Sequence, residues 1–154
     1  MSPDTPAGQR QRGFLRCETE KIRELLRKQF GADVDLKFYV GGKGRVYAYK
    51  DCEFEGRKGI YFGTLEKNGV RLSIEGSFIV GRIAEKNVVE VDDATALKWL
   101  RGEDLSVDEG MRGYYILKWG EYFLGCGKAA NGVLRNYVPK ERRLTKDTNG
   151  EGGE

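Results

Sequence analysis

The sequence predicts an α+β fold, in which a meandering, barrel-like sheet of short strands is accompanied by two helices. Glycine makes up 22 of the 154 residues and proline only 3, whereas average glycine usage is roughly 7%. A glycine excess without proline indicates many tight turns rather than a linker. Apolar residues alternate with period two in several segments, and one segment near the N-terminus follows the helical period instead.

The first helix is predicted over residues 18–30. Ile22, Leu26 and Phe30 belong to one apolar stripe at helical spacing, and Gly31 suits the position just after a helix. Short strands separated by turns follow it. These strands are predicted at 34–40, 45–50, 59–65, 77–81 and 88–91, with turns at 41–44 and 67–69.

A second helix is predicted over residues 93–101. Asp92 or Asp93 can cap its first turn, and Gly102 can end it. The last third of the chain returns to strands, and Asn-Gly is a strong signal for a two-residue hairpin turn. The predicted strands are 113–119, 121–128 and 133–138, joined by turns at Trp119-Gly120 and Asn131-Gly132.

The composition narrows the function classes. The chain contains no histidine, which excludes Ser-His-Asp and Cys-His catalysis and removes the commonest zinc ligand. Cys17, Cys52 and Cys126 form no CxxC pair and are predicted to be reduced thiols of a cytoplasmic protein. No apolar run reaches the roughly 18 residues that a membrane span needs. The net charge of +3 is only mildly basic.

Two basic segments carry the candidate binding residues. Basic side chains outnumber the single acid between Arg135 and Lys146, and such a segment can neutralise phosphates. Within it, the amide of Asn136 can read a base edge and the ring of Tyr137 can stack on a base. The second segment is a hairpin in which Lys43 and Arg45 lie beside Tyr47 and Tyr49. The predicted RNA-binding residues are Lys43, Arg45, Lys128, Arg135, Asn136, Lys140, Arg142 and Arg143.

Both segments also have an interpretation without a ligand. The charge of the C-terminal segment fits a solvated strand, and the second segment fits a soluble hairpin with half-buried tyrosines. Side chains alternate along a strand, so Arg135 and Tyr137 share one face and Asn136 takes the other. Only one of these two sets can therefore point toward RNA while the other packs inward.

Signatures of other sites are weak in this chain. Gly125-x-Gly127-x-x-Ala130 loosely matches a dinucleotide loop, but it leads into a hairpin turn rather than a helix. The acidic pairs Asp92-Asp93 and Glu103-Asp104 are better explained as a helix cap and a loop. The sequence therefore predicts no metal, no cofactor and no enzyme activity. A deep pocket that gathers Cys126, Lys128 and acids would favour a small enzyme instead.

An ordered set of motifs in the second half resembles a known family. It is similar to the PUA-like C-terminal RNA-binding region of the NOL1/NOP2/Sun (RsmF-type) RNA cytosine-5 methyltransferases. The similarity covers roughly residues 55–143 and extends more vaguely to the N-terminal helix. Its motifs are Gly59-Ile60-Tyr61-Phe62-Gly63, Ala96-Leu97-x-Trp99-Leu100-x-Gly102-Glu103-Asp104-Leu105, Gly113-Tyr114-Tyr115-Ile116-Leu117, Leu124-Gly125-x-Gly127-Lys128, Asn131-Gly132 and Arg135-Asn136-Tyr137-x-Pro139-Lys140.

The resemblance implies a PUA-like mixed β-barrel with two or three helices that binds structured ribosomal or transfer RNA. The family's Pro-Cys catalytic dipeptide is absent, and the chain has no room for its methyltransferase domain. We therefore expect a stand-alone RNA-binding protein in rRNA or tRNA modification or ribosome biogenesis, with an RNA-modification enzyme as a further partner. The alternative is a non-catalytic protein-interaction subunit of an RNA-modification complex.

The predicted domain organisation has three parts. Residues 1–12 are expected to be a disordered arm and 145–154 a flexible tail, because both are polar and rich in turn-forming residues. Residues 13–144 are predicted to form the PUA-like domain, in which an N-terminal α/β subdomain over 13–104 packs on 105–144.

Overall fold

The computed structural model describes residues 15–50 and 59–144. The predicted arm and tail, together with Cys52, lie outside the described residues. The described chain forms three α-helices and two five-stranded sheets. The helices are α2 (Thr19–Phe30), α3 (Ile74–Gly81) and α4 (Asp93–Leu100). The strands are β1 (Arg16–Cys17), β2 (Lys37–Val40), β3 (Arg45–Tyr49), β4 (Ile60–Glu66), β5 (Gly69–Leu72), β6 (Val88–Glu90), β7 (Leu105–Ser106), β8 (Gly113–Trp119), β9 (Tyr122–Ala130) and β10 (Val133–Arg135).

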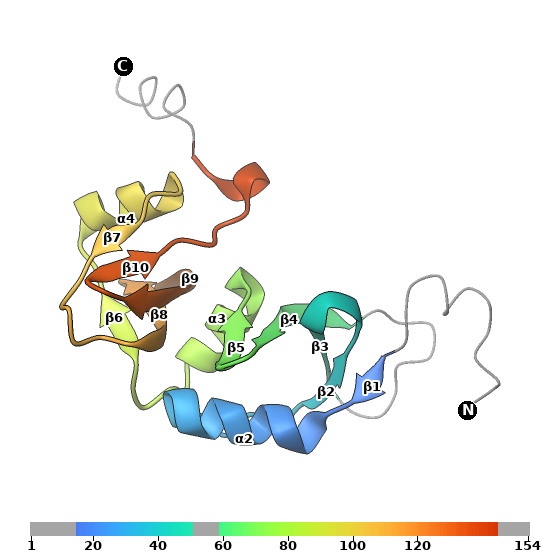
Figure 1. Cartoon of the computed structure of the whole chain (residues 1–154). Coiled ribbons are helices and arrows are strands. Elements are labelled where there is room, and N and C mark those ends of the chain that lie inside the picture. Colours follow the sequence, from blue (N-terminus) through green and yellow to red (C-terminus); the bar gives the residue numbers. More distant parts are fainter. Residues whose placement is uncertain (1–14, 51–58, 145–154) are drawn as a thin grey trace.

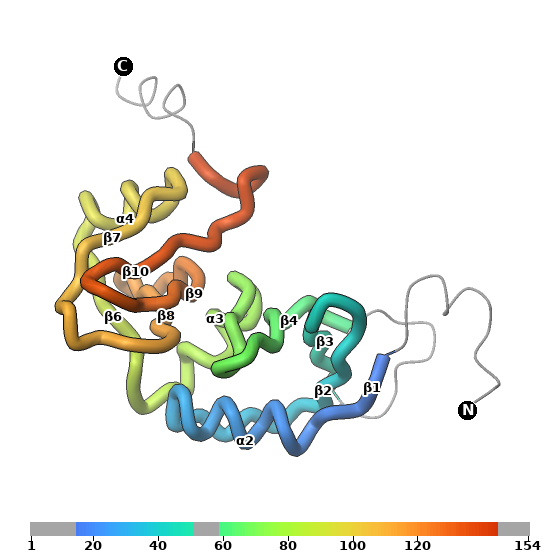
Figure 2. Tube along the Cα trace, viewed as in Figure 1, coloured from blue at the N-terminus to red at the C-terminus, as the bar shows by residue number. Residues whose placement is uncertain are grey.

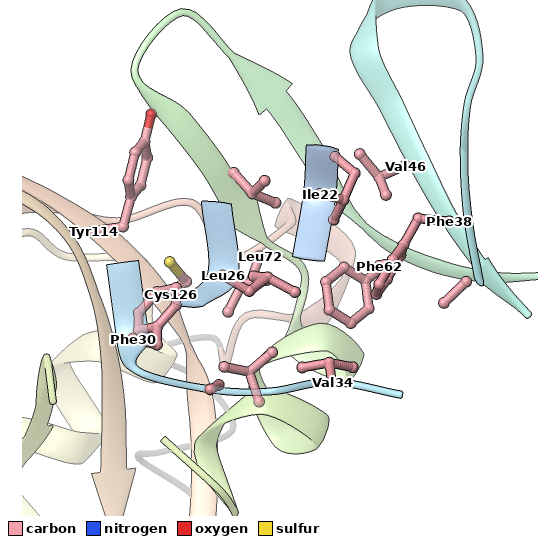
Figure 3. Packing of buried hydrophobic residues seen from close by; sticks show 14 of the residues in the cluster. Ile22, Leu26, Phe30, Val34, Phe38, Val46, Phe62, Leu72, Tyr114 and Cys126 are labelled. Atoms are coloured by element: carbon pink, nitrogen blue, oxygen red, sulfur yellow. The ribbon is translucent and has the colours of Figure 1, made fainter. Parts of the chain in front are cut away.

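The first sheet is an antiparallel meander in the order β1-β2-β3-β4-β5, and α2 packs against one of its faces (Figure 1). The predicted apolar stripe of α2 is confirmed, since Ile22, Leu26 and Phe30 are fully buried. Figure 3 shows Ile22 on the side of Phe38 and Phe62 from the sheet, whereas Phe30 lies beside Cys126 in the same core. Gly31 adopts the left-handed conformation that ends the helix, as predicted.

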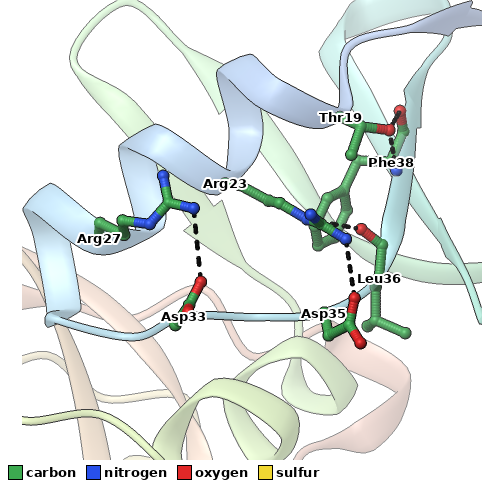
Figure 4. Close-up of polar contacts among 7 residues, drawn as sticks. All are labelled: Thr19, Arg23, Arg27, Asp33, Asp35, Leu36 and Phe38. Atoms are coloured by element: carbon green, nitrogen blue, oxygen red, sulfur yellow. Dashed lines mark hydrogen bonds and ion pairs between the residues drawn. The ribbon is translucent and has the colours of Figure 1, made fainter.

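Polar contacts hold α2 to the segment that follows it (Figure 4). The Thr19 hydroxyl accepts a hydrogen bond from the backbone N–H of Phe38 at 2.9 Å. The Arg23 guanidinium donates to the Leu36 carbonyl at 3.1 Å and pairs with the Asp35 carboxylate at 3.1 Å. Side chains of α2 thus satisfy the N–H of Phe38 in β2 and the carbonyl of Leu36 just before it.

The strand predicted over 77–81 is wrong, because this segment belongs to helix α3. The Ser73 side chain caps that helix by accepting a hydrogen bond from the Gly76 N–H at 2.9 Å. A Cβ atom at Gly76 would collide with the Phe62 carbonyl oxygen, so glycine lets α3 lie directly against β4. A short apolar run fits a buried strand and a buried helix equally well, and here the cap and the close contact decide.

The second sheet is a curled half-barrel in the order β6-β8-β9-β10-β7, and α4 lies beside it (Figure 2). β6 pairs with β8 in parallel, and the other pairs are antiparallel. The predicted α+β fold with a PUA-like barrel is confirmed, as are the Asp92 cap of α4 and the turn at Asn131-Gly132. Strands β1, β5 and β7 were not predicted, since they are too short or too close to a turn to show a period.

Trp99 lies at the centre of the second core. It is fully buried among Leu117, Leu124 and Leu134, and its indole Nε1 donates a hydrogen bond to the Leu124 carbonyl at 3.1 Å. Gly127 lies under the ring, where a Cβ atom would come within 2.7 Å of Trp99 Cη2. Gly127 is therefore required by the packing of Trp99 against strand β9.

The two sheets share part of the first core. Tyr114, Ile116 and Cys126 of the second sheet pack with the side chains of α2 and β2–β5. The Gln29 side-chain amide of α2 pairs with both backbone polar groups of Val70, at 2.7 and 3.0 Å, and so covers the edge of β5. The subdomain boundary near residue 104 remains a prediction. Among the described residues, no helix has the length and hydropathy of a membrane span.

Candidate nucleic-acid interface

A row of three side chains crosses the second sheet. Tyr114, Lys128 and Arg135 stand directly opposite one another on β8, β9 and β10, and residues paired in this way point to the same face. The Lys128 Nζ lies 5.5 Å from the centre of the Tyr114 ring, and Arg135 is exposed. The sheet register therefore brings two of the predicted basic residues together.

The first sheet adds a further cation to this row. Arg71 of β5 donates to the Glu66 carboxylate at 2.8 Å, and its guanidinium lies 4.1 Å from the centre of the Tyr137 ring. The Tyr114 hydroxyl donates to the other oxygen of Glu66 at 2.6 Å. Glu66 thus joins the two sheets where they meet. We call the group formed by Arg71, Lys128, Arg135 and Tyr137 the seam surface.

The charge of Glu66 is maintained by its partners. Burial by itself raises the pKa of this carboxyl, but hydrogen bonds from Tyr114 and Arg71 outweigh burial and hold the pKa below its usual value. Burial, followed by the hydrogen bond to Glu66, raises the pKa of Tyr114 well above its usual value. Tyr114 therefore stays a neutral donor, and Glu66 stays an ionised acceptor that orients Arg71.

Glu66→Gln is expected to lower the free energy of unfolding by about 1–2 kcal/mol at pH 7, because it removes a half-buried, charge-assisted pair. The pKa of Glu66 is lower in the folded state, so its stabilising contribution is present at neutral pH and is lost as the pH falls through that value. Urea unfolding should therefore show the stabilities of parent and variant converging as the pH falls below the usual pKa of a glutamate. Glu121→Gln, which alters an exposed turn carboxyl, is the control and should show no such convergence. A difference that persists at low pH would contradict this account.

Asn136 has a structural role that differs from the predicted one. The residue is 9% exposed, and its side chain donates to the carbonyls of Trp99 and Glu103 at 2.8 and 2.9 Å. Its oxygen accepts from the Val138 N–H at 2.7 Å. The predicted reading of a base edge by Asn136 is therefore wrong, because the amide is used to hold the end of α4 against the last strand. The alternation argument holds, since Asn136 points inward while Arg135 is exposed.

The three basic residues that follow β10 have different surroundings. Arg142 pairs with Glu75 of α3 at 3.0 Å, and Arg143 donates to the Val138 carbonyl at 2.8 Å and lies over Gly102. Lys140 is exposed and forms no ion pair with any described residue. These contacts leave Lys140 freer to meet a ligand than its two neighbours.

Lys43 and Arg45 lie on the first sheet, in the 3-10 turn Gly42–Gly44 and at the start of β3. The register places Arg45 opposite Thr64, and Thr64 opposite Arg71. The row from Arg45 to Arg71 therefore connects the hairpin with the seam surface. Within the described residues, neither Lys43 nor Arg45 forms an ion pair.

Sequence reasoning missed Arg71, Glu66 and Tyr114 as members of this site. Arg71 belongs to a strand that was not predicted, and Glu66 carries a charge opposite to that expected of an RNA contact. A period-two reading of Gly69–Leu72 would have placed Arg71 on the outer face. Its contact with Tyr137 joins residues far apart in the chain, and no local pattern reveals it.

Cys126 and Lys128 do not form an enzyme pocket. Cys126 is buried, and burial raises the pKa of its thiol to about 12, which keeps it protonated. Lys128 is two residues away in the same strand, so the two side chains point to the same face, but the thiol is covered by the first core. No group of three or more metal-ligating side chains occurs among the described residues.

Comparisons with known proteins find the resemblance that the sequence indicated. Residues 86–144 match the family described as the methyltransferase RsmF PUA domain. Proteins named ribosomal RNA small subunit methyltransferase F are similar to this chain. The protein from Vibrio vulnificus is 28% identical over 93 residues, and that from Aeromonas salmonicida is 33% identical over 94. Each match covers 60% of this chain and 19% of the relative, so the chain spans about a fifth of the length of these relatives.

Proposed function

We propose, from the match of residues 86–144 to the RsmF PUA domain, that this chain is an RNA-binding module that acts in the modification of ribosomal RNA. The observation that carries the proposal is the seam surface. Three basic side chains and one tyrosine gather on it, and two of them, Lys128 and Arg135, stand on adjacent strands of the matched segment.

The proposed mechanism is electrostatic docking on a folded RNA. Lys128 and Arg135 project side by side from neighbouring strands, which lie about 5 Å apart, so two cations can meet successive phosphates. Arg71 is held by Glu66 on one side and by the Tyr137 ring on the other, so little of its motion is left to lose on binding. Because Asn136 is buried, the surface recognises shape and phosphates rather than a base edge.

Lys128→Gln/Arg135→Gln is expected to weaken binding to transcribed small-subunit ribosomal RNA about tenfold at moderate salt. Each lost phosphate contact should also reduce the slope of log K against log salt by roughly 0.7–0.9. Fluorescence anisotropy over a range of KCl concentrations measures both quantities.

Lys21→Gln/Lys28→Gln is the matched control for this double variant. It removes the same number of positive charges from exposed positions of α2 that are not part of the seam surface. If the control weakens binding as much as the seam variant does, net charge rather than this surface accounts for the affinity. Lys140→Gln is expected to add a smaller loss, whereas Arg142→Gln should act mainly through its pair with Glu75.

The proposed role in the cell is to bring a modification enzyme to its RNA. The relatives are named as methyltransferases, and the matched part is their PUA domain. We propose that the chain binds ribosomal RNA and acts with a methyltransferase. Crosslinking the protein to cellular RNA, followed by sequencing of the bound fragments, tests whether small-subunit ribosomal RNA is the partner.

A second candidate function is that of a protein-interaction subunit, and an apolar groove favours it. The groove has a volume of about 910 Å³ and lies mainly between α3 and the β8–β9 hairpin, with Ile60 of β4 beside them. Phe78, Ile60 and Tyr122 line it and are 49%, 48% and 67% exposed, and exposed apolar clusters often mark protein contacts. A methyltransferase that stays bound in nuclease-treated lysate, and is lost on Phe78→Ser, would support this function.

A further inference from the structure

The outer face of the first sheet carries a row of tyrosines. Register places Tyr39 of β2 opposite Tyr47 of β3, and Tyr47 opposite Tyr61 of β4. The rings of Tyr47 and Tyr61 are tilted with their centres 6.0 Å apart. Tyr61 is 40% exposed and Tyr47 is half-buried. We call Tyr47, Tyr61, Lys43 and Arg45 the tyrosine face.

A bulge in β4 produces this arrangement. The pairing of β3 with β4 shifts between Val46 and Tyr47, so that Gly63 faces Val46 while Tyr61 faces Tyr47. Phe62 then points into the core, where it is fully buried, and Tyr61 and Thr64 both stay on the outer side, joined by a hydrogen bond of 2.7 Å. Bulges of this kind redirect side chains at functional edges of sheets.

The charge around the tyrosines is positive. Arg45 lies two residues before Tyr47 on the same face of β3, and Lys43 lies in the turn that precedes this strand. Both are exposed and, within the described part of the chain, have no acidic partner. Aromatic rings flanked by cations are the features with which proteins bind single-stranded nucleic acids, since bases stack on the rings while phosphates meet the charges.

The tyrosine face is continuous with the seam surface. Arg45, Thr64 and Arg71 form one row across β3, β4 and β5, and Arg71 lies against the Tyr137 ring. An RNA strand that leaves a duplex on the seam surface can therefore follow this row to the tyrosines.

We infer that the tyrosine face binds a single-stranded RNA segment flanking the structured element on the seam surface, which rests on the RNA-binding function proposed above. Bases stack on Tyr47 and Tyr61, and phosphates meet Lys43 and Arg45. The two surfaces thus select RNA in which a helix is followed by an unpaired strand, because only such an RNA contacts both.

The test uses a fluorescein-labelled RNA hairpin, alone and with a tail of about ten uridines at either end, a length within known site sizes. For the parent protein, a tail on at least one end should tighten binding about tenfold. Tyr47→Ala/Tyr61→Ala should abolish this gain and leave the affinity for the bare hairpin unchanged. Tyr47→Phe/Tyr61→Phe, which keeps the rings, should retain the gain.

A second variant guards against misfolding. Lys43→Asn/Arg45→Gln changes exposed side chains only and should reduce the gain from the tail at least threefold. If neither tail improves binding by more than twofold, or if the gain survives in both the alanine and the charge variants, the inference is wrong while the RNA-binding function stands. If the parent protein binds no hairpin at all, both proposals fail together.

Discussion

Trp99→Ala is expected to lower the free energy of unfolding by about 3–5 kcal/mol, the range found when large buried aromatic side chains are truncated. Trp99 has no exposed surface and fills the second core between α4 and the curled sheet. Its removal also leaves the Leu124 carbonyl without the indole donor. Gly127 has no side chain where its backbone lies against this ring. Nothing at that position can therefore fill the cavity that the substitution leaves. Urea unfolding followed by circular dichroism measures the loss.

Trp119→Ala is the matched control for this substitution. Trp119 is only half-buried, and its indole donates to the exposed carboxylate of Asp93 at 2.8 Å. Its truncation should cost roughly 1 kcal/mol, as is common outside a core. Equal losses for the two variants would show that the second core does not depend on Trp99.

Asn136→Ala is expected to lower the free energy of unfolding by about 3 kcal/mol. The amide side chain satisfies the carbonyls of Trp99 and Glu103 and the N–H of Val138. A buried backbone group that loses its partner costs about 1–3 kcal/mol, and partial access of water reduces the sum. Melting curves and urea midpoints report the loss.

The same variant separates a structural role from a role in binding. At a temperature where the variant is folded, its affinity for RNA should equal that of the parent protein, because the amide does not reach the surface. Asn68→Ala, in the exposed turn between β4 and β5, is the control and should change stability by less than about 0.5 kcal/mol. A stable variant with weakened RNA binding would restore Asn136 to the binding set.

Local patterns predicted most of the elements because each was decided within a few residues. The stripe of α2 with its terminal Gly31, the Asp92 cap of α4 and the Asn131-Gly132 turn all lie where the sequence placed them. Segment 77–81 was predicted wrongly because its apolar residues have no clear period. Its helix depends on the Ser73 cap and on contact with β4.

The candidate site depended much more on tertiary structure. Lys128 and Arg135 could be predicted to be near each other from the hairpin turn between their strands. Arg71 could not, because its place against Tyr137 requires β5 of the first sheet to lie beside the segment that follows β10 of the second sheet. Asn136 was misjudged for a related reason, since an amide within a basic segment looks like a reader of bases until its buried partners are known.

Period, turn residues and charge are local properties, so the α+β class with a barrel-like sheet and the positive charge of residues 135–146 could be predicted from the amino-acid sequence. The tertiary structure decided which charges remain available. It pairs Arg142 with Glu75 and buries Asn136, whereas it brings Lys128 and Arg135 side by side and orients Arg71 through Glu66. Charged side chains and amides find their partners on the elements that pack against them. These elements are often far apart in the sequence, so local patterns do not reveal the partners.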